Sequence, residues 1–303
     1  MHIPVMMSEV VDSFSGFTDG WIVDGTLGMA GHSIKLLNEK PFINLLGIDV
    51  DEEAMLYAKQ SLIGFESRVR LEHGNYKNMV EIAKRNNILK VKAILLDLGI
   101  SSLQIDTPER GFSFRYQSDL DMRFDVGQNI TAAEIINYYS ETELANIFYN
   151  YGEERNSRKI ANAIVLSRPI LTTLELANLI VKCSKKFRSK VHPATKVFQS
   201  LRIAVNEELV NVKKGLIQAV KLLDKNGRIA ILSYHSIEDR IIKNYFRESS
   251  LSCICPVSLI ECNCDHVATI RIVNKKVIKP SLKEITINPR SRSAKLRIIE
   301  KLA

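Results

Sequence analysis

Four short apolar segments in the first hundred residues constrain the fold of this chain more than any other feature. Stretches of helical character separate them, and they span residues 21–23, 45–48, 69–71 and 93–96. Nearly continuous apolar runs of this kind are typical of parallel strands that are covered on both faces. The alternation of strand and helix predicts an open α/β domain built on a parallel sheet.

The middle of the chain has a different character. Residues from about 105 to 207 lack convincing strands, and capping-box patterns begin at Thr131, Ser140 and Thr172. An amphipathic helix is expected from about 207 to 223, and strand character returns at 228–232, 268–273 and 294–299. We therefore predict a discontinuous α/β domain, residues 1–104 and 208–303, interrupted by an all-helical insertion, residues 105–207.

Composition narrows the class of protein. The 303 residues are 46% hydrophobic and 25% charged, as in an ordinary globular protein, and no apolar run approaches the roughly 20 residues that cross a bilayer. The N-terminus lacks a basic segment followed by an apolar one, and five cysteines in a chain this long do not suggest a secreted disulfide scaffold. We expect a cytoplasmic protein. A net charge of +8 is compatible with a polyanionic partner, although many basic proteins bind no nucleic acid.

The sharpest local signal is the segment DGTLGMAGH at residues 24–32, which follows the first predicted strand and precedes a helix. Glycines in such a turn let the backbone approach a ligand, and free amides at the helix start face it. The spacing is not that of the dinucleotide fingerprint, and Asp24 ends the strand. A carboxylate is better suited to binding the cationic sulfonium of S-adenosylmethionine than to binding the anionic pyrophosphate of a dinucleotide. The alternative is a tight turn with an incidental aspartate.

Acidic residues also end two other predicted strands. Asp49 ends the second, where a carboxylate can accept both hydroxyl hydrogens of a ribose, or could cap the next helix as Asp51 could. Asp97 ends the fourth. Tyr76 follows the third strand and offers a ring for adenine, although a single tyrosine is more often core or surface filler. Ligands bind at the carboxyl ends of strands in open α/β sheets, so these positions predict one cofactor site.

Eight further segments resemble one family along nearly the whole chain. They are HIPV (2–5), RGFSF (110–114), LDMR (120–123), YGEER (151–155), HPATK (192–196), FQSLR (198–202), SYHSIEDR (233–240) and NPRSRSAKLR (288–297). Their order and length resemble the bacterial ribosomal RNA small subunit methyltransferase H family, the MraW-like enzymes that methylate N4 of a cytidine in 16S rRNA.

The resemblance implies a Rossmann-like class I methyltransferase sheet with a helical insertion, and S-adenosyl-L-methionine as cofactor. It implies methylation of cytidine 1402 in the decoding region of the small ribosomal subunit. The cofactor contacts that it implies are Ala30, Gly31, His32, Asp49, Tyr76, Asp97 and Gln104. A homodimer is compatible with this class of enzyme.

The chain departs from the family pattern at three places. Ala30 replaces a glycine, and its methyl group should be harmless if its φ is negative. Tyr76 replaces a phenylalanine and can still stack. The chain has Gln117-Ser118-Asp119 where the family usually has D-G-P. The aspartate that the family has in this loop is therefore replaced, and a catalytic role for it is without support here. Asp119 lies two positions further along the chain.

The exocyclic amine of cytosine is a poor nucleophile, because its lone pair is delocalised into the ring. A carboxylate that accepts hydrogen bonds from the amine can align it for transfer. We assign this role to Asp97 and name His235, after the next central strand, as a second catalytic candidate; a structural histidine at the strand end is the alternative.

The target base must leave its stack before it can react. The helical insertion and the basic tail are the expected RNA-facing elements. Candidate phosphate contacts are Arg110, Arg123, Lys196, Arg202, Arg290, Arg292 and Lys295, each of which could equally be a solvated surface charge.

Two C-x-C pairs, Cys253 with Cys255 and Cys262 with Cys264, resemble a zinc-binding arrangement. Their brackets are tighter than the usual C-x-x-C, so reduced or redox-labile cysteines without a metal are the favoured interpretation. Three alternatives for the whole chain are a nicotinamide oxidoreductase, a DNA amino-methyltransferase and a non-catalytic ribosome-binding factor. The missing dinucleotide fingerprint argues against the oxidoreductase. The DNA amino-methyltransferases usually have a proline-rich tetrapeptide where this chain has DLGI at 97–100. The retained cofactor-side residues argue against a non-catalytic factor.

Overall fold

The computed structural model describes residues 4–184, 192–256, 259 and 261–302, without the side chain of Ser102. His2 and Ile3 of the N-terminal motif therefore lie outside the described residues. The chain divides into two units, one formed by Met1–Gly99 and Leu209–Ala303 and the other by Ile100–Glu208. Each unit has its own hydrophobic core.

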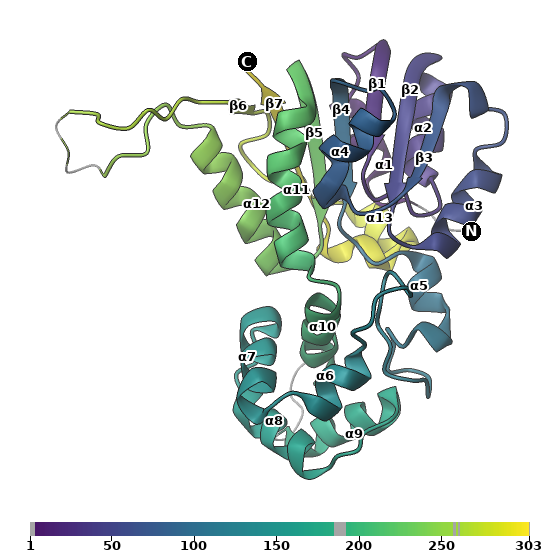
Figure 1. The fold of residues 1–303 in the computed structure, drawn as a ribbon, viewed down its shortest axis with the longest axis vertical. Coiled ribbons are helices and arrows are strands. Elements are labelled where there is room, and N and C mark those ends of the chain that lie inside the picture. Colours follow the sequence, from purple (N-terminus) through teal and green to yellow (C-terminus); the bar gives the residue numbers. More distant parts are fainter. Residues whose placement is uncertain (1–3, 185–191, 257–258, 260, 303) are drawn as a thin grey trace. The chain divides into compact units, whose positions relative to one another are not determined.

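The first unit is built on one seven-stranded sheet of order β3-β2-β1-β4-β5-β7-β6 (Figure 1). The strands are β1 (Asp19–Asp24), β2 (Phe42–Asp49), β3 (Val69–His73), β4 (Val91–Asp97), β5 (Leu223–Ser233), β6 (Ile270–Ile272) and β7 (Lys295–Lys301). The first five are parallel, and β7 is antiparallel to both β5 and β6. Every strand predicted from the sequence overlaps one of these, so the predicted α/β class is confirmed.

Two layers of helices cover the sheet, because successive side chains of a strand point to opposite faces. Ile22 of β1 packs with α1 (Met7–Ser13), α2 (Gly31–Glu39) and α3 (Glu52–Ser61). Its neighbour Val23 packs with α4 (Met79–Arg85), α11 (Glu208–Leu222) and α12 (Ser236–Ser249) on the other face. The short elements are η1 (Glu66–Arg68), η2 (Tyr76–Asn78), α13 (Leu282–Ile287) and η4 (Pro289–Ser293).

The second unit is helical. Its elements are α5 (Ser102–Asp106), η3 (Pro108–Arg110), α6 (Ala132–Tyr138), α7 (Glu141–Gly152), α8 (Ser157–Leu166), α9 (Thr173–Cys183) and α10 (Ala194–Val205). The three predicted capping boxes are confirmed at the starts of α6, α7 and α9. Among its described residues, β-type pairing is limited to an isolated bridge between Asp119 and Thr172. In neither described unit does a helix have the length and apolar character needed to cross a membrane.

Candidate active site

The predicted site lies at one edge of the sheet. β1, β2 and β4 run parallel and end at Asp24, Asp49 and Asp97, while β5 ends at Ser233 and leads into Tyr234 and His235. The strand order reverses between β1 and β4, which is where open α/β sheets bind their ligands.

Asp24 holds the turn after β1 in place. Its carboxylate accepts hydrogen bonds from the Ser33 hydroxyl (2.7 Å) and from the Thr26 backbone N–H (3.2 Å). Burial raises the pKa of Asp24, although these hydrogen bonds oppose the shift. Both oxygens of Asp24 therefore hold the turn after β1 in shape.

Ala30 corrects one expectation from the sequence. It is the N-cap of α2 and is fully buried, and its φ is +64°, in the left-handed region that favours glycine. The condition under which the alanine would be harmless is therefore not met. Gly31 begins α2 next to it, and a Cβ at Gly31 would overlap the Pro4 ring, so the N-terminal segment packs closely on this turn.

We expect Ala30→Gly to change the free energy of unfolding by less than about 0.5 kcal/mol, because relief of left-handed strain offsets the lost methyl burial. Ala58→Gly, an equally buried position inside α3, should cost about 2 kcal/mol, since no strain is relieved there. Urea denaturation of both variants measures the difference. Equal losses would show that Ala30 is unstrained.

Asp49 ends β2 with a carboxylate that is bound by two backbone amides. Its two oxygens accept hydrogen bonds from the backbone N–H groups of Gly28 (2.7 Å) and Asp51 (3.0 Å), which leaves each oxygen further acceptor capacity. Asp51, rather than Asp49, caps α3 by accepting from Glu53 and Ala54. Burial, with repulsion from Asp51 and Asp24, raises the pKa of Asp49 to about 6. The alternative helix-cap role is thus filled by its neighbour.

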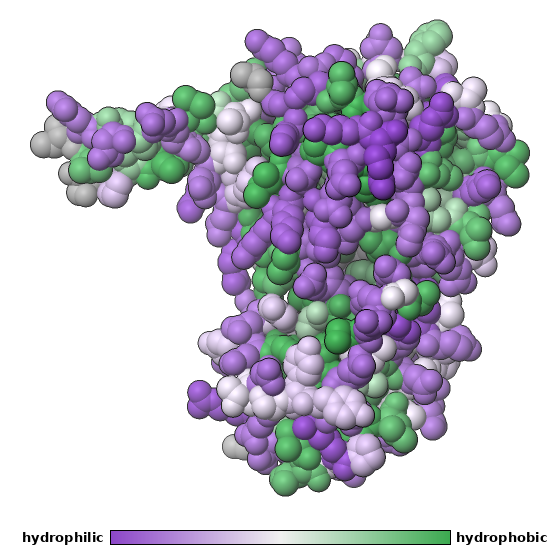
Figure 2. Space-filling model, viewed as in Figure 1, coloured by the Kyte–Doolittle hydropathy of each residue, from purple (hydrophilic) through white to green (hydrophobic). Residues whose placement is uncertain are grey.

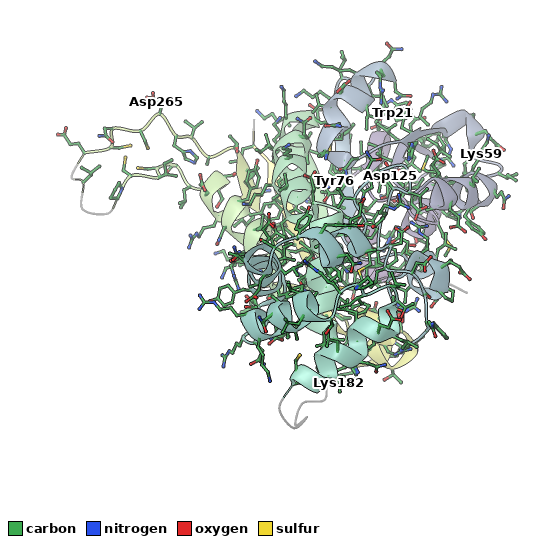
Figure 3. All side chains as sticks on the ribbon, turned by 60° about the horizontal axis from the view of Figure 1, so that its bottom comes forward. Trp21, Lys59, Tyr76, Asp125, Lys182 and Asp265 are labelled. Atoms are coloured by element: carbon green, nitrogen blue, oxygen red, sulfur yellow. The ribbon has the colours of Figure 1, made fainter. Side chains whose placement is uncertain are left out.

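Tyr76 is positioned by a residue that the sequence did not single out. The tyrosine begins η2 just after β3, and is labelled in Figure 3. A Cβ on Gly215 of α11 would overlap Cδ2 of the Tyr76 ring and lie 2.5 Å from its Cε2, so the ring rests directly on the α11 backbone. Only glycine leaves room for it. No local pattern reveals this contact, because Gly215 looks like an ordinary helix residue in the sequence.

Asp97 is the most elaborately held carboxylate of the site. Its Oδ1 accepts from the Tyr234 hydroxyl (2.8 Å) and from the Gly99 N–H (3.4 Å), while its Oδ2 lies 3.9 Å from Nδ1 of His32. Its own N–H donates to the Thr26 hydroxyl (2.6 Å). The turn after β1 therefore holds the backbone of Asp97, and Tyr234 after β5 holds its side chain.

Tyr234 was missed in the sequence. Burial, reinforced by the Asp97 carboxylate, raises the pKa of Tyr234 well above its ordinary value, so the hydroxyl keeps its proton and acts as a donor. Two features of the sequence point to Tyr234: its place directly after β5 and its position in the SYHSIEDR segment (233–240).

The next residue, His235, has a structural position. It is the N-cap of α12, where Nδ1 accepts from the Glu238 N–H (3.4 Å) and Nε2 lies 2.9 Å from Glu238 Oε1. Glu238 Oε2 in turn accepts from the Tyr234 N–H (3.0 Å). Both ring nitrogens thus face Glu238, and we assign His235 to positioning Tyr234 rather than to proton transfer.

Gln104 belongs to the second unit. Its N–H donates to the Ser101 hydroxyl (3.2 Å) and its Oε1 accepts from the Ser101 N–H (3.1 Å), which forms a capping box for α5. Its predicted cofactor contact remains a proposal.

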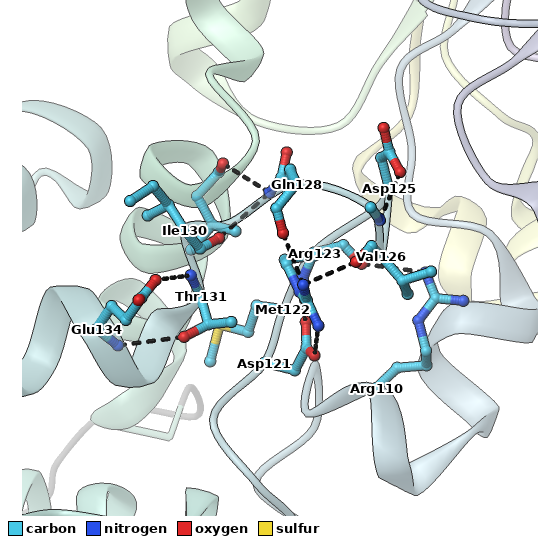
Figure 4. A network of polar contacts seen from close by, with 12 residues as sticks. Arg110, Asp121, Met122, Arg123, Asp125, Val126, Gln128, Ile130, Thr131 and Glu134 are labelled. Carbon is cyan, nitrogen blue, oxygen red and sulfur yellow. Dashed lines mark hydrogen bonds and ion pairs between the residues drawn. The ribbon is translucent and has the colours of Figure 1, made fainter.

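Most of the predicted phosphate contacts have polar partners within their own unit. Arg110 is buried and donates to the carbonyls of Arg123 and Phe124 (3.0 Å each). Arg123 binds the Asp121 carboxylate through two nitrogens and donates to the carbonyls of Val126 and Gln128 (Figure 4). Hydrogen bonds from Arg123 hold the pKa of Asp121 below its ordinary value against the opposing effect of burial. This network builds the loop before α6.

The remaining predicted phosphate contacts differ in exposure. Arg202 forms a nearly buried pair with Glu208 (2.6 and 2.8 Å), and Lys295 pairs with Asp239 (3.0 Å). Lys196 is exposed and donates to the Glu153 carbonyl (2.9 Å). Arg290 and Arg292 are also exposed. We therefore retain Lys196, Arg290 and Arg292 as RNA-facing candidates and assign Arg110, Arg123, Arg202 and Lys295 to the architecture.

The sheet order, the antiparallel β7, the glycine-containing turn after β1 and the carboxylate at the end of β2 are those of a class I methyltransferase, whose cofactor is S-adenosyl-L-methionine. The model of the MraW methylase family matches residues 1–302, and the chain belongs to this family.

Three curated relatives carry the name ribosomal RNA small subunit methyltransferase H. The protein of Dehalococcoides mccartyi (strain BAV1) is 47% identical over 302 residues, which cover 99% of this chain and 86% of the relative. That of Halothermothrix orenii is 44% identical, covering 99% and 98%. That of Carboxydothermus hydrogenoformans is 42% identical, covering 100% and 98%.

Proposed function

We propose that this protein transfers a methyl group from S-adenosyl-L-methionine to N4 of a cytidine in 16S rRNA, cytidine 1402 by family resemblance. The observation that carries the proposal is the Asp97 carboxylate at the end of β4, held on Oδ1 by Tyr234 and facing His32 with Oδ2. The names of the relatives support ribosomal RNA of the small subunit as the substrate. We place the reaction in the cytoplasm, where that subunit is found.

The residues at the sheet edge fit this cofactor. Asp49 retains acceptor capacity for two ribose hydroxyls, and Tyr76 offers an aromatic ring for adenine. The turn with Ala30, Gly31 and His32 brings backbone to the same edge. When bound, the cofactor supplies an electrophilic methyl group on a positively charged sulfur, which the nearby carboxylates favour electrostatically.

Asp97 would act on the amine of the target base. Oδ1 is occupied by Tyr234 and Gly99, so Oδ2 is the oxygen that accepts a hydrogen bond from the exocyclic N4. Acceptance of this hydrogen bond orients the amine and favours the tetrahedral geometry in which its lone pair can attack. The same oxygen would receive the proton that N4 must lose. Tyr234, by donating to Oδ1, fixes the carboxylate in this orientation.

Nucleoside mass spectrometry tests the function directly. Small subunits and naked 16S rRNA, both lacking the modification, are incubated separately with the protein and isotopically labelled S-adenosyl-L-methionine. Labelled N4-methylcytidine at a single position is expected in one of them. Cofactor binding without label in either preparation would point to another nucleic acid, such as DNA, whereas absent binding would favour a non-catalytic ribosome-binding factor.

Cofactor affinity should depend on the ionisation of Asp49. Its pKa is raised to about 6, so the carboxylate becomes protonated as the pH falls below that value and loses one of its ribose acceptors. We expect the dissociation constant of S-adenosyl-L-methionine to rise about tenfold from pH 7 to pH 5. Calorimetric titrations at both pH values measure this, and Asp49→Asn should bind more weakly but without that pH dependence. A wild-type affinity that does not change would contradict the assignment.

The same shift affects the stability of the cofactor-free protein. Because the folded-state pKa lies above the unfolded value of 3.8, the folded protein binds more protons between the two. The contribution of Asp49 to the free energy of unfolding therefore declines as the pH rises from about 4 through about 6. Hydroxyl donors from a bound ribose would offset that loss.

A further inference from the structure

A long arm connects α12 to β6 in the first unit and extends away from the sheet (Figure 1). It carries both C-x-C pairs, and Asp265 near the second pair is labelled on it in Figure 3. Methyl transfer as proposed above makes no use of these four cysteines. Their arrangement therefore requires an explanation of its own.

The arm brings the four thiols together. The Sγ atoms of Cys253, Cys255, Cys262 and Cys264 all lie within 4.8 Å of one another. Cys262 Sγ is 3.3 Å from that of Cys253 and 3.6 Å from that of Cys264, and the Cys264–Cys253 distance is 3.7 Å. Four sulfurs bound tetrahedrally at about 2.3 Å from a zinc ion would lie about 3.8 Å apart. A disulfide requires sulfurs about 2.05 Å apart.

Backbone amides support the sulfurs as they would support thiolates. The Cys255 N–H donates to Cys253 Sγ (3.4 Å), and the N–H groups of Ile254 and His266 donate to Cys264 Sγ. The His266 ring is engaged elsewhere, since its Nε2 lies 3.1 Å from the Glu248 carbonyl oxygen. The ligand set is therefore four sulfurs, without the histidine.

The arm has little else to hold it. No described side chain between residues 251 and 269 is fully buried. Leu251, Ile254, Leu259 and Val267 are exposed apolar residues, and Figure 2 shows hydrophobic residues at the surface of the arm. A segment without a core needs a cross-link or a metal to keep one conformation.

We infer that Cys253, Cys255, Cys262 and Cys264 bind one structural zinc ion that fixes the arm. A closed set of four sulfur ligands is typical of structural zinc sites and leaves no open coordination position for catalysis. Binding converts four thiols into thiolates and releases their four protons to solvent. The sequence favoured metal-free cysteines because of the short C-x-C spacing. In the structure the arm folds back on itself, so that the sulfur atoms of Cys253 and Cys255 lie beside those of Cys262 and Cys264.

The test uses the full chain, purified under reducing conditions without added chelator. Elemental analysis by mass spectrometry is expected to give about one zinc ion per chain. Cys253→Ser and Cys262→Ser, one from each pair, should lose most of it. Cys183→Ala is the matched control, because Cys183 is a buried cysteine of the second unit and should leave zinc unchanged. Cobalt substituted for zinc should show the visible bands of a tetrahedral thiolate complex.

A second readout reports the structural role of the metal. Removal of zinc with a chelator should expose residues 250–269 to limited proteolysis, and zinc added back should restore protection. Reduced, metal-free cysteines in the purified protein would overturn the inference, as would disulfides found by mass spectrometry of the unreduced chain or zinc retained by both serine variants. None of these measurements depends on methyl transfer.

Discussion

Asp97→Asn is expected to lower kcat for rRNA methylation by about 10²- to 10⁴-fold, with cofactor affinity changed no more than a few-fold. The asparagine oxygen can replace Oδ1 and keep its hydrogen bonds from Tyr234 and Gly99. The amide nitrogen then stands where Oδ2 was, and it is a donor that cannot accept a hydrogen bond from the cytosine amine. Single-turnover methylation with saturating rRNA, together with calorimetric titration of S-adenosyl-L-methionine, separates the two effects.

Tyr234→Phe should lower kcat by less than Asp97→Asn does. It removes the hydroxyl that orients Asp97 but leaves the carboxylate, so we expect a loss of about tenfold in kcat. Full activity of Asp97→Asn with normal cofactor affinity would refute the role of Asp97, and the role of Tyr234 with it.

Gly111→Ala should have the largest effect on stability, about 3 kcal/mol or more from the second unit. Gly111 has φ +69°, and a Cβ there would overlap the carbonyl oxygen of Asp119 and lie 2.9 Å from the backbone nitrogen of Asp121. Both are backbone atoms, so neither can move aside without moving the loop that contains the Arg123 network (Figure 4). Differential scanning calorimetry measures the loss. Methylation of rRNA should fall with it, since we propose that this unit contacts the RNA.

Gly127→Ala is the control in the same unit. A Cβ at Gly127 would approach only the exposed end of the Asp125 side chain, at 3.0 Å, and the φ of Gly127 lies outside the left-handed region. We expect a change within about 0.5 kcal/mol. If Gly111→Ala were no worse than this control, the tight approach of Gly111 to Asp119 would not exist in solution.

Features encoded within a few residues were predictable from the sequence. The apolar runs gave the strands, because a parallel strand covered on both faces needs apolar residues throughout. The capping boxes at Thr131, Ser140 and Thr172 were also visible, since the two partners lie three residues apart. The strand ends that carry Asp49 and Asp97 followed from the same runs.

Features that depend on distant contacts were not predictable. Tyr234 meets Asp97 across 137 positions of the chain, and Gly215 meets Tyr76 from another helix. The positive φ of Ala30 is set by the packing of the whole turn, and no residue pattern reports it. Charge alone could not separate Arg202, paired with Glu208, from an exposed arginine such as Arg292. The type of a residue indicates which interactions its side chain can make, but its contacts in the fold determine whether those interactions are already formed within the protein.

The pairing of β4 with β5 has a consequence for how the chain folds during its synthesis. The entire helical unit lies between these two neighbouring strands, so β4 leaves the ribosome long before β5 does. During that interval the half-sheet β3-β2-β1-β4 presents an unpaired parallel edge, the kind of surface on which chains associate wrongly. The intervening helices share a hydrophobic core of their own and can pack on one another before β5 emerges, which replaces a long flexible loop by a folded spacer. Early folding of that spacer would then shorten the time for which the half-sheet edge stays open.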